Sequence, residues 1–368
     1  MSLERFRKKG GKIDFWLLFF VFALCIFGLL MIYSSSAVLS FEQYGVNNFY
    51  FKKQLISLII GLVVMVIASA IDYKFWQKYA GIFLAVAIVS LLAVFIFSSE
   101  VSGAKRWIQI GGFTIQPSEI TKLSFVIYLA AWLSKRKEHI KDFKYGFIPF
   151  LIILGVIGFL IMKQPDMGTM SIIVAVGVIM FFASGASIYH IGAGFVLLGG
   201  LFFILIKSAP YRMQRFLVFL NPSNEKLGAG YHINQAQLAI GSGGLLGLGF
   251  GQSKQKYLYL PEPHTDSIFA IICEELGFLR AIIVIIVFLL IALRGFRIAK
   301  NAPDDFSRLL VIGIISWITV QFFVNISAML GLLPLTGIPM PFVSFGGSSL
   351  IILLTAIGIV LNISKQSN

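Results

Sequence analysis

The sequence predicts an all-α, polytopic integral membrane protein with ten transmembrane helices. Of the 368 residues, 58% are hydrophobic and only 12% are charged, and the mean hydropathy is +0.90. A soluble domain of this length needs more charge to cover its surface. In addition, long stretches contain no Asp, Glu, Lys or Arg, and they match or exceed the ~20 residues that cross a bilayer as a helix. These stretches are 15–41, 54–71, 79–99, 167–206 and 309–364.

The ten helices are placed by these apolar stretches and by the segments that interrupt them. The forty-residue run 167–206 is divided in two, because a single helix of that length would measure ~60 Å, about twice the hydrocarbon core. The small and polar residues 183–187 provide the break. The expected helices are 14–36, 54–71, 77–98, 118–134, 147–163, 167–183, 187–207, 266–293, 307–331 and 345–363.

Basic residues predict the orientation of the chain in the membrane. They gather in segments 1–12, 135–146 and 294–308, and short basic segments stay on the cytoplasmic side. The division of 167–206 brings all three to that side. We therefore expect one domain over 1–368 in the cytoplasmic membrane, with cytoplasmic tails at 1–13 and 364–368. A large extracytoplasmic loop, 208–265, joins the seventh and eighth helices.

The net charge of +14 does not indicate a nucleic-acid-binding protein. The basic residues lie between predicted spans, and no soluble basic domain is present to hold a duplex. Cys25 and Cys273 both lie in apolar segments and form no pattern of metal ligands or disulfides. The sequence therefore predicts no structural metal site.

Several charged residues lie in or beside predicted spans, where a charge costs on the order of 3 kcal/mol or more. Glu119 and Lys122 are three residues apart and share a helix face. Structural pairing and a functional role are equally good interpretations of that pair. For Arg280, in the eighth span, a structural role is favoured. Further charges in or beside spans are Lys163, Asp166, Glu274 and Glu275.

A Gly-rich segment, GSGGLLGLGFGQS at 241–253, lies in the outward loop. It has no Gly-Lys-Ser/Thr ending and is not a Walker loop. One interpretation is a flexible or re-entrant hairpin. The other is backbone that approaches the phosphates of a ligand, with Lys254 and Lys256 directly following. A second unusual segment, 331–349, contains three prolines and no charge. It is either a tight loop or the wall of a cavity.

Asp266 lies where the eighth predicted helix begins, after the segment YLPEPHT. One interpretation is that it caps the helix N-terminus. The alternative is catalytic, because a carboxylate at the outer membrane face could accept a proton from a sugar hydroxyl. Its neighbour His264 and the basic Gly-rich loop favour that alternative.

Taken together, these segments closely resemble the SEDS family, which includes FtsW, RodA and SpoVE. The resemblance spans nearly the whole chain. It rests on GAKRWI at 103–108, QPSEITKL at 116–123, QPDMGT at 164–169, 230–266, EELGF at 274–278 and 331–349. The stretch GQSKQKYLYLPEPHTD is more similar to FtsW and SpoVE than to RodA. Ser267, where the family commonly has Phe, and Cys273, where a smaller residue is common, depart from the family pattern.

The resemblance implies a peptidoglycan glycosyltransferase that polymerises lipid II into glycan strands at the outer face of the cytoplasmic membrane. It also implies work beside a class B penicillin-binding protein and other division proteins, and it gives Asp266 the role of catalytic base. Substrate-binding candidates within the motifs are Arg106, Gln116, Glu119, Lys122, Gln164, Asp166, Tyr231, Ser253, Lys254, Lys256, His264, Thr265 and Ser344.

The leaving pyrophosphate of such a reaction needs cationic groups at the outer face. The candidates are Arg106, Arg212, Arg215, Lys254 and Lys256, and a divalent cation, Mg²⁺ or Mn²⁺, could assist. Two other functions remain open at this point. One is a lipid II flippase, and the other is a non-catalytic scaffold that recruits division proteins.

Overall fold

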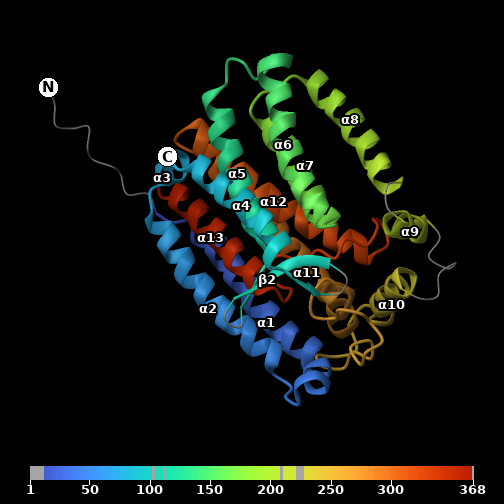
Figure 1. The fold of residues 1–368 in the computed structure, drawn as a ribbon. Coiled ribbons are helices and arrows are strands. Elements are labelled where there is room, and N and C mark those ends of the chain that lie inside the picture. Colours follow the sequence, from blue (N-terminus) through green and yellow to red (C-terminus); the bar gives the residue numbers. More distant parts are fainter. Residues whose placement is uncertain (1–11, 102–103, 111–112, 208–209, 221–227, 367–368) are drawn as a thin grey trace.

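The computed structural model describes residues 12–101, 104–110, 113–207, 210–220 and 228–366, and most of them are helical (Figure 1). Within these residues a helix lies at each of the ten predicted places. They are α1 (Phe15–Tyr44), α2 (Phe49–Ala70), α4 (Ala80–Phe97), α5 (Pro117–Lys135), α6 (Ile148–Lys163), α7 (Met167–Ala183), α8 (Ile188–Lys207), α11 (Ile268–Lys300), α12 (Asp305–Met329) and α13 (Gly347–Ser364). The run 167–206 therefore forms two helices, as the break at 183–187 predicts.

Shorter elements connect these helices. They are α3 (Tyr73–Lys78), the π-helical turn η2 (Phe143–Phe147), α9 (Pro210–Leu220) and α10 (Ala229–Ser242). Within the described residues, strands β1 (Ser99–Val101), β2 (Ala104–Ile110) and β3 (Phe113–Ile115) form an antiparallel sheet in that order. Hydropathy did not predict these strands, since they are short and follow directly on an apolar helix.

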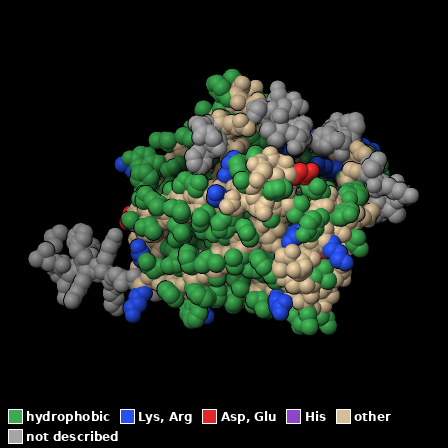
Figure 2. Space-filling model, turned by 90° about the horizontal axis from the view of Figure 1, so that it is seen from below, with side chains coloured by type: hydrophobic (Ala, Val, Ile, Leu, Met, Phe, Trp, Pro, Cys, Tyr) green, Lys and Arg blue, Asp and Glu red, His purple; other side chains and the backbone are tan. Residues whose placement is uncertain are grey.

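The fold is that of a polytopic membrane protein. Among the described residues, seven helical segments are long and apolar enough to cross a membrane: α1, α2, α4, Phe143–Lys163, α11, α12 and α13. The apolar helix α7 has 17 residues. Many large apolar side chains are exposed on the outside of the bundle, including Phe19 at 50% and Phe159 at 61%. Hydrophobic side chains also dominate the face in Figure 2, with Lys and Arg scattered among them. Ten spans and their orientation stay predictions.

The start of α1 and the end of α13 lie at one end of the bundle, opposite α9 and α10 (Figure 1). The Asp14 backbone N–H donates to Ser364 Oγ at 3.1 Å, and Arg294 pairs with Asp14 at 2.8 Å. Lys137 pairs with Asp305 at 2.9 Å at the same end. The basic segments 135–146 and 294–308 thus lie at the end where α1 begins, as the charge pattern predicts. Tail residues 1–11 and 367–368 lie outside the described residues.

The helix α11 is broken at Gly277, whose φ of 80° and ψ of 173° are not helical. A break frees main-chain groups that need new partners. The Gly-rich segment provides them: the Leu248 N–H donates to Glu274 O at 2.9 Å, and the Phe278 N–H donates to Gly244 O at 2.9 Å. A Cβ on Gly243 or Gly247 would overlap with the backbone of α11. The glycines therefore allow close backbone packing.

These contacts decide between the two interpretations of segment 241–253. The N–H groups of Gly247, Leu248, Gly249 and Gln252 already donate to main-chain carbonyls, so they are not free to bind phosphate. The side chains of Leu245 and Leu246 are 66% and 67% exposed, which suits a re-entrant hairpin at a membrane surface. The structure therefore favours the hairpin interpretation over the phosphate-binding one.

Candidate functional site

Asp266 lies in the turn 261–267 that leads into α11. The N-cap position of α11 is occupied by Ser267, so the interpretation of Asp266 as the helix cap is wrong. The amide of Asn325 on α12 donates to Asp266 O and to Ile338 O, both at 2.8 Å. This polar residue in an apolar helix holds the turn 261–267 and the Pro-rich segment 331–349 against each other. No motif in the sequence pointed to Asn325, although a lone amide in a predicted span is a usable signal.

Asp266 is only partly exposed, and Thr265, Glu262 and Arg215 act on its carboxylate. Thr265 Oγ1 lies 3.3 Å from its Oδ1. Burial, and then the negative charge of Glu262, raise the pKa of Asp266 from 3.8 to about 7, while hydrogen bonds from its own backbone and Thr265 and the charge of Arg215 act in the opposite direction. A carboxylate whose pKa lies near the operating pH suits general base catalysis.

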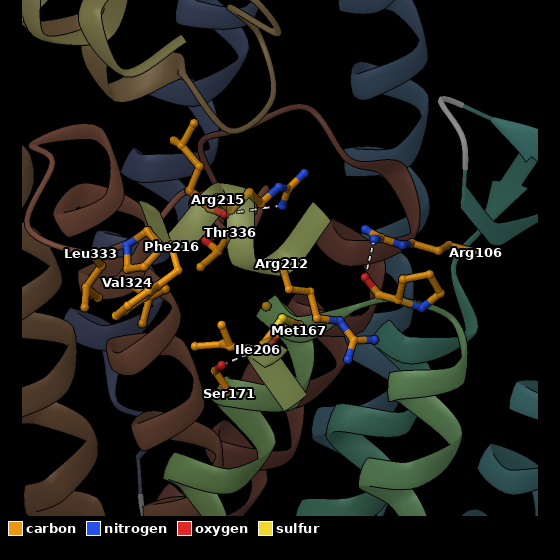
Figure 3. Close-up of a pocket in the computed structure, with 14 residues that line it drawn as sticks. Arg106, Met167, Ser171, Ile206, Arg212, Arg215, Phe216, Val324, Leu333 and Thr336 are labelled. Carbon is orange, nitrogen blue, oxygen red and sulfur yellow. Dashed lines mark hydrogen bonds between the residues drawn. The ribbon is translucent and has the colours of Figure 1, made fainter. Parts of the chain in front are cut away.

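A cavity of about 200 Å³ lies beside this turn (Figure 3). Apolar side chains line much of it, and three arginines of the described chain contribute to it, Arg106, Arg212 and Arg215. Its remaining lining residues come from the start of α7, the end of α8, α9, α12 and the Pro-rich segment. They are Pro165, Met167, Gly168, Ser171, Ile206, Phe216, Val324, Leu333, Pro334, Leu335 and Thr336. The Pro-rich segment is therefore a cavity wall, one of the two predicted alternatives.

Hydrogen bonds orient two of these arginines. Arg106 Nε donates to Gln164 O at 3.0 Å, and its Nη2 donates to Pro165 O (Figure 3). Arg215 Nη1 donates to Leu335 O at 3.3 Å. Arg106 comes from strand β2 and Arg215 from helix α9, so segments far apart in the sequence bring their charges to one cavity. Guanidinium groups in such a place attract a phosphate or pyrophosphate.

Asp266 is a neighbour of this cavity, although the lining found among the described residues does not include it. Arg215 belongs to the lining and also acts electrostatically on Asp266. A Cβ on Gly337, which follows the lining residue Thr336, would lie 3.9 Å from Asp266 Oδ2. A carboxylate of raised pKa thus lies at the edge of a cavity that is lined by three cationic arginine side chains.

The predicted residues Gln116, Gln164 and Asp166 lie next to Pro165, which lines the cavity. Asp166 caps α7, accepting from the Thr169 N–H at 3.0 Å and from Thr169 Oγ1 at 2.8 Å. Gln116 Nε2 reaches Asp166 Oδ2 at 3.4 Å. Gln164 Nε2 donates to Leu91 O at 2.9 Å. These contacts position the loop whose carbonyls hold Arg106.

Glu119 and Lys122 form a buried ion pair of 2.7 Å. The Lys122 ammonium also donates to Gln321 Oε1 at 2.8 Å and lies 5.1 Å from the centre of the Trp317 ring. Gln321 Nε2 in turn donates to Pro339 O at 2.9 Å. The pair therefore links α5 and α12 to the Pro-rich segment. Gln321, which the sequence analysis did not identify, is the third member of this network.

Lys256 and Ser253 have structural partners. Lys256 Nζ pairs with Glu275 at 3.0 Å and lies 3.2 Å from Ser34 Oγ, with all three side chains buried. Ser253 Oγ donates to the carboxylate of Glu274. Lys254 has an exposed side chain. None of these residues is part of the cavity lining in the described chain.

His264, Ser344 and Tyr231 are also outside that lining. The His264 ring packs against Tyr50 at 4.3 Å and Phe345 at 5.4 Å between ring centres, and burial lowers its pKa to about 4. Ser344 Oγ accepts from the Met340 N–H at 2.8 Å. Tyr231 is half-buried on α10. His264 and Ser344 thus stabilise the turns that carry Asp266 and the Pro-rich segment.

The protein-family model FTSW_RODA_SPOVE, described as cell cycle protein, matches residues 15–368. The chain belongs to the FtsW/RodA/SpoVE family.

Curated members of the FtsW/RodA/SpoVE family align over almost the full length of the chain. Stage V sporulation protein E of Bacillus subtilis is 41% identical over 357 residues, which are 96% of this chain and 97% of that protein. A Trichlorobacter lovleyi protein named Probable peptidoglycan glycosyltransferase FtsW is 40% identical over 367 residues, 98% of this chain and 96% of that protein.

Solved structures share the fold. A chain from a peptidoglycan synthase complex superposes with a TM-score of 0.81 at 24% identity, covering 96% of this chain and 97% of that one. The rod shape determining protein RodA of Thermus thermophilus superposes with a TM-score of 0.72 at 24% identity, covering 96% of this chain and 97% of that one. The predicted polytopic membrane fold is confirmed by these likenesses.

Proposed function

We propose that this protein is a peptidoglycan glycosyltransferase that polymerises lipid II into glycan strands. One observation carries the proposal: Asp266, with a pKa near 7, lies at the edge of a cavity lined by Arg106, Arg212 and Arg215. Glycosyl transfer between two polyprenyl-pyrophosphate-linked sugars needs these two elements, a base for the acceptor and cations for the leaving group. The names of the curated FtsW relatives support the same activity.

In the proposed reaction, the oxygen of the 4-hydroxyl of lipid II attacks the anomeric carbon of the growing strand. Asp266 takes the proton of that hydroxyl as the attack proceeds. The bond between that carbon and the pyrophosphate oxygen breaks, and the leaving group carries away the electron pair. A single displacement of this kind inverts the anomeric centre and needs one base and no covalent sugar intermediate. The arginines stabilise the charge that develops on the pyrophosphate.

Arginines are the groups that can stabilise this charge, because three of them line the cavity while the described part of the chain offers few carboxylates that could hold a metal ion there. Among the described residues, no group of three or more His, Cys, Asp or Glu lies close enough to hold a metal ion. At this place the carboxylates that could bind a metal ion are those of Asp266 and Glu262. A Mg²⁺ or Mn²⁺ ion at this place would therefore draw most of its ligands from the substrate pyrophosphate and water.

The proposed place of work is the outer face of the cytoplasmic membrane. The turn with Asp266 lies near α10, at the end of the bundle opposite the basic segments (Figure 1). The positive-inside rule assigns those basic segments to the cytoplasm. The proposed partner is a class B penicillin-binding protein that cross-links the strands within the division machinery. The family's description as cell cycle protein and the FtsW relatives support a role in division.

The test is polymerisation of labelled lipid II by the purified protein together with its cognate transpeptidase. Wild type is expected to produce a ladder of glycan strands, and Asp266→Asn is expected to produce none while it stays folded and bound to its partner. Polymer formed by the Asn variant at the wild-type rate would remove Asp266 from the mechanism.

Two further outcomes identify the rival functions. A lipid II flippase would move lipid II across liposome membranes without making polymer. A non-catalytic scaffold would make no polymer with any partner, and cells carrying Asp266→Asn would divide normally. The gathering of three arginines in one cavity beside Asp266 favours the transferase.

A further inference from the structure

Glu262 and Asp266 share one hydroxyl group between their carboxylates. Thr265 Oγ1 lies 2.9 Å from Glu262 Oε2 and 3.3 Å from Asp266 Oδ1. A hydroxyl has a single proton to donate, so it can donate to one carboxylate while it accepts from the other only when that other group is protonated. The three side chains therefore form a short chain of hydrogen bonds from the half-buried Asp266 to Glu262, whose side chain is exposed.

The backbone holds Glu262 in this position at a conformational cost. Its φ is 49°, in the left-handed region that a non-glycine residue rarely adopts, and it stands between Pro261 and Pro263. The Glu262 carbonyl accepts from the N–H groups of Thr265 and Ser267, both at 3.3 Å. A tight turn thus directs the Glu262 side chain back to Thr265. Such strained positions concentrate at functional sites.

A base that takes a proton in each turnover must also lose it. Asp266 is only partly exposed, and a bound polyprenyl-linked sugar would cover it further. We propose that Thr265 and Glu262 form a proton exit, in which the proton taken by Asp266 moves through Thr265 to Glu262 and from there to water. This inference rests on the proposed function, and it makes Thr265 and Glu262 positioning residues that act through Asp266.

The proton balance of this exit closes without any co-reactant. Protonated Asp266 donates its proton to Thr265 Oγ1, and the Thr265 hydroxyl gives its own proton to Glu262 Oε2. Protonated Glu262 releases a proton to solvent and returns to the carboxylate. Asp266 is then ionised again for the next acceptor hydroxyl. The net change is one proton from the sugar hydroxyl to water, as the displacement reaction requires.

Other charged and titratable groups face this chain from neighbouring elements. Arg215 of α9 acts electrostatically on Asp266, and His232 of α10 lies close enough to interact with Glu262 and Arg215. Tyr50 of α2 also interacts with Glu262. His232 Nε2 lies 2.6 Å from Ser267 Oγ, and burial lowers the pKa of His232 to about 4. A neutral His232 does not compete with Glu262 for the outgoing proton at neutral pH.

The experiment is the pH dependence of lipid II polymerisation between about pH 5.5 and 9 by the full chain with its transpeptidase. Thr265→Val keeps the shape of the side chain and removes the hydroxyl. We expect it to lower the maximal rate about tenfold or more, with the KM for lipid II changed less than about twofold. Thr265→Ser restores the hydroxyl and is expected to return the rate to within about threefold of wild type.

The Glu262→Gln variant distinguishes a role of Glu262 in proton transfer from an effect of its negative charge alone. Loss of the negative charge favours ionised Asp266, so the rise of the rate with pH moves to lower pH in either case. A proton exit additionally requires the rate at high pH to fall, by about tenfold. A variant whose rate at high pH equals the wild-type rate, with only the midpoint shifted, would show that Glu262 acts by charge alone and would overturn the proposal.

Two variants outside the site serve as controls. Each removes the same kind of chemical group as a test variant, a hydroxyl or a carboxylate charge, at a place away from Asp266. Thr355→Val removes a hydroxyl that bonds to Ile351 O on α13, and Glu138→Gln neutralises an exposed carboxylate at the opposite end. Both are expected to keep the wild-type rate and pH profile. Full activity of Thr265→Val together with an inactive Asp266→Asn would contradict the proton exit and leave the proposed function intact. Activity of both variants would contradict the role of Asp266 as the catalytic base.

Discussion

Gly277 of α11 and Gly247 of the Gly-rich segment are in direct backbone contact. A Cβ on either residue would overlap with main-chain atoms of the other segment, and both residues have positive φ, 80° for Gly277 and 83° for Gly247. The break in α11 and the re-entrant hairpin therefore depend on each other. Glu274 and Glu275, directly before the break, hold Ser253 and Lys256 of the segment that leads to Asp266.

Gly277→Ala is expected to destabilise the protein by roughly 3 kcal/mol or more, because the added Cβ meets backbone and cannot be accommodated by a side-chain rotation. Thermal unfolding in detergent micelles measures the effect. Gly81→Ala on α4 is the matched control, since no atom lies within 4 Å of its added Cβ, and it is expected to be neutral. A Gly277→Ala variant as stable as wild type would contradict the close backbone contact.

Lys256 and Glu275 form a buried pair, so removal of one partner leaves an uncompensated charge. We expect Lys256→Met or Glu275→Gln alone to cost about 3–5 kcal/mol of folding free energy. The double variant should cost less than the sum of the two, because no charge is left unpaired. Unfolding midpoints of wild type, the two single variants and the double variant form the required double-mutant cycle.

The same variants test whether Lys256 binds substrate, as the sequence analysis predicted. A substrate-binding role would raise the KM for lipid II in Lys256→Met without a change of stability. A structural role would lower stability and leave the KM of the folded fraction unchanged. The buried ion pair favours the structural result.

The arginines of the cavity are expected to act on the leaving pyrophosphate. Arg212→Gln or Arg215→Gln should lower the maximal polymerisation rate about tenfold to a hundredfold, because charge develops on the leaving group as the glycosidic bond breaks. The measurement is the initial rate with labelled lipid II at saturation. Arg297→Gln, an exposed arginine near the opposite end of α11, is the control. Equal rates for all three variants would remove the cavity from the proposed mechanism.

The raised pKa of Asp266 predicts how the polymerisation rate depends on pH. Its carboxyl has a pKa of about 7 in the folded protein and must be ionised to act as a base. The polymerisation rate should therefore rise through a midpoint near pH 7 and level off above it. A profile that is flat from about pH 5.5 to 8 would show that this carboxyl does not control the rate.

The same pKa shift predicts how stability depends on pH. A carboxyl whose pKa is raised on folding, here from 3.8 to about 7, favours folding when it is protonated. This stabilisation is complete below pH 3.8, falls as the pH rises towards 7, and is absent above it. Asp266→Asn, which is neutral at every pH, should therefore be more stable than wild type at about pH 8 and equal to it near pH 4. A thermal unfolding series over this range checks the prediction.

The positions of the long helices could be predicted from the sequence because hydropathy and charge are local properties. The break in run 167–206 was correctly predicted for that reason, and the basic segments do gather at one end of the bundle, while their cytoplasmic side stays a prediction. The Pro-rich segment 331–349 was assigned two alternatives, and only its contacts with α9 and α12 identified it as a cavity wall. Strands β1 to β3 were missed because short strands after an apolar helix have no distinct periodicity.

The candidate site was predicted in part. Asp266 and the cations Arg106, Arg212 and Arg215 were named from the sequence, but their shared location required the fold. Lys256 was assigned to the substrate because it follows a Gly-rich segment, and the structure pairs it with Glu275. Glu262 lies inside a recognised motif and was passed over, since its relation to Thr265 depends on a turn with positive φ.

By itself, the sequence determined that this chain spans a membrane repeatedly, which ends carry the basic segments, and which family it resembles. The membrane spans and the basic ends follow from the free-energy cost of placing charges and unpaired backbone groups in hydrocarbon. That cost depends on the residues of each segment alone, without contacts to other segments. Only the tertiary structure decided which polar groups face one another. An ion pair, a cavity lined by several separate segments, or a hydroxyl between two carboxylates depends on chain reversals that no local pattern of residues specifies.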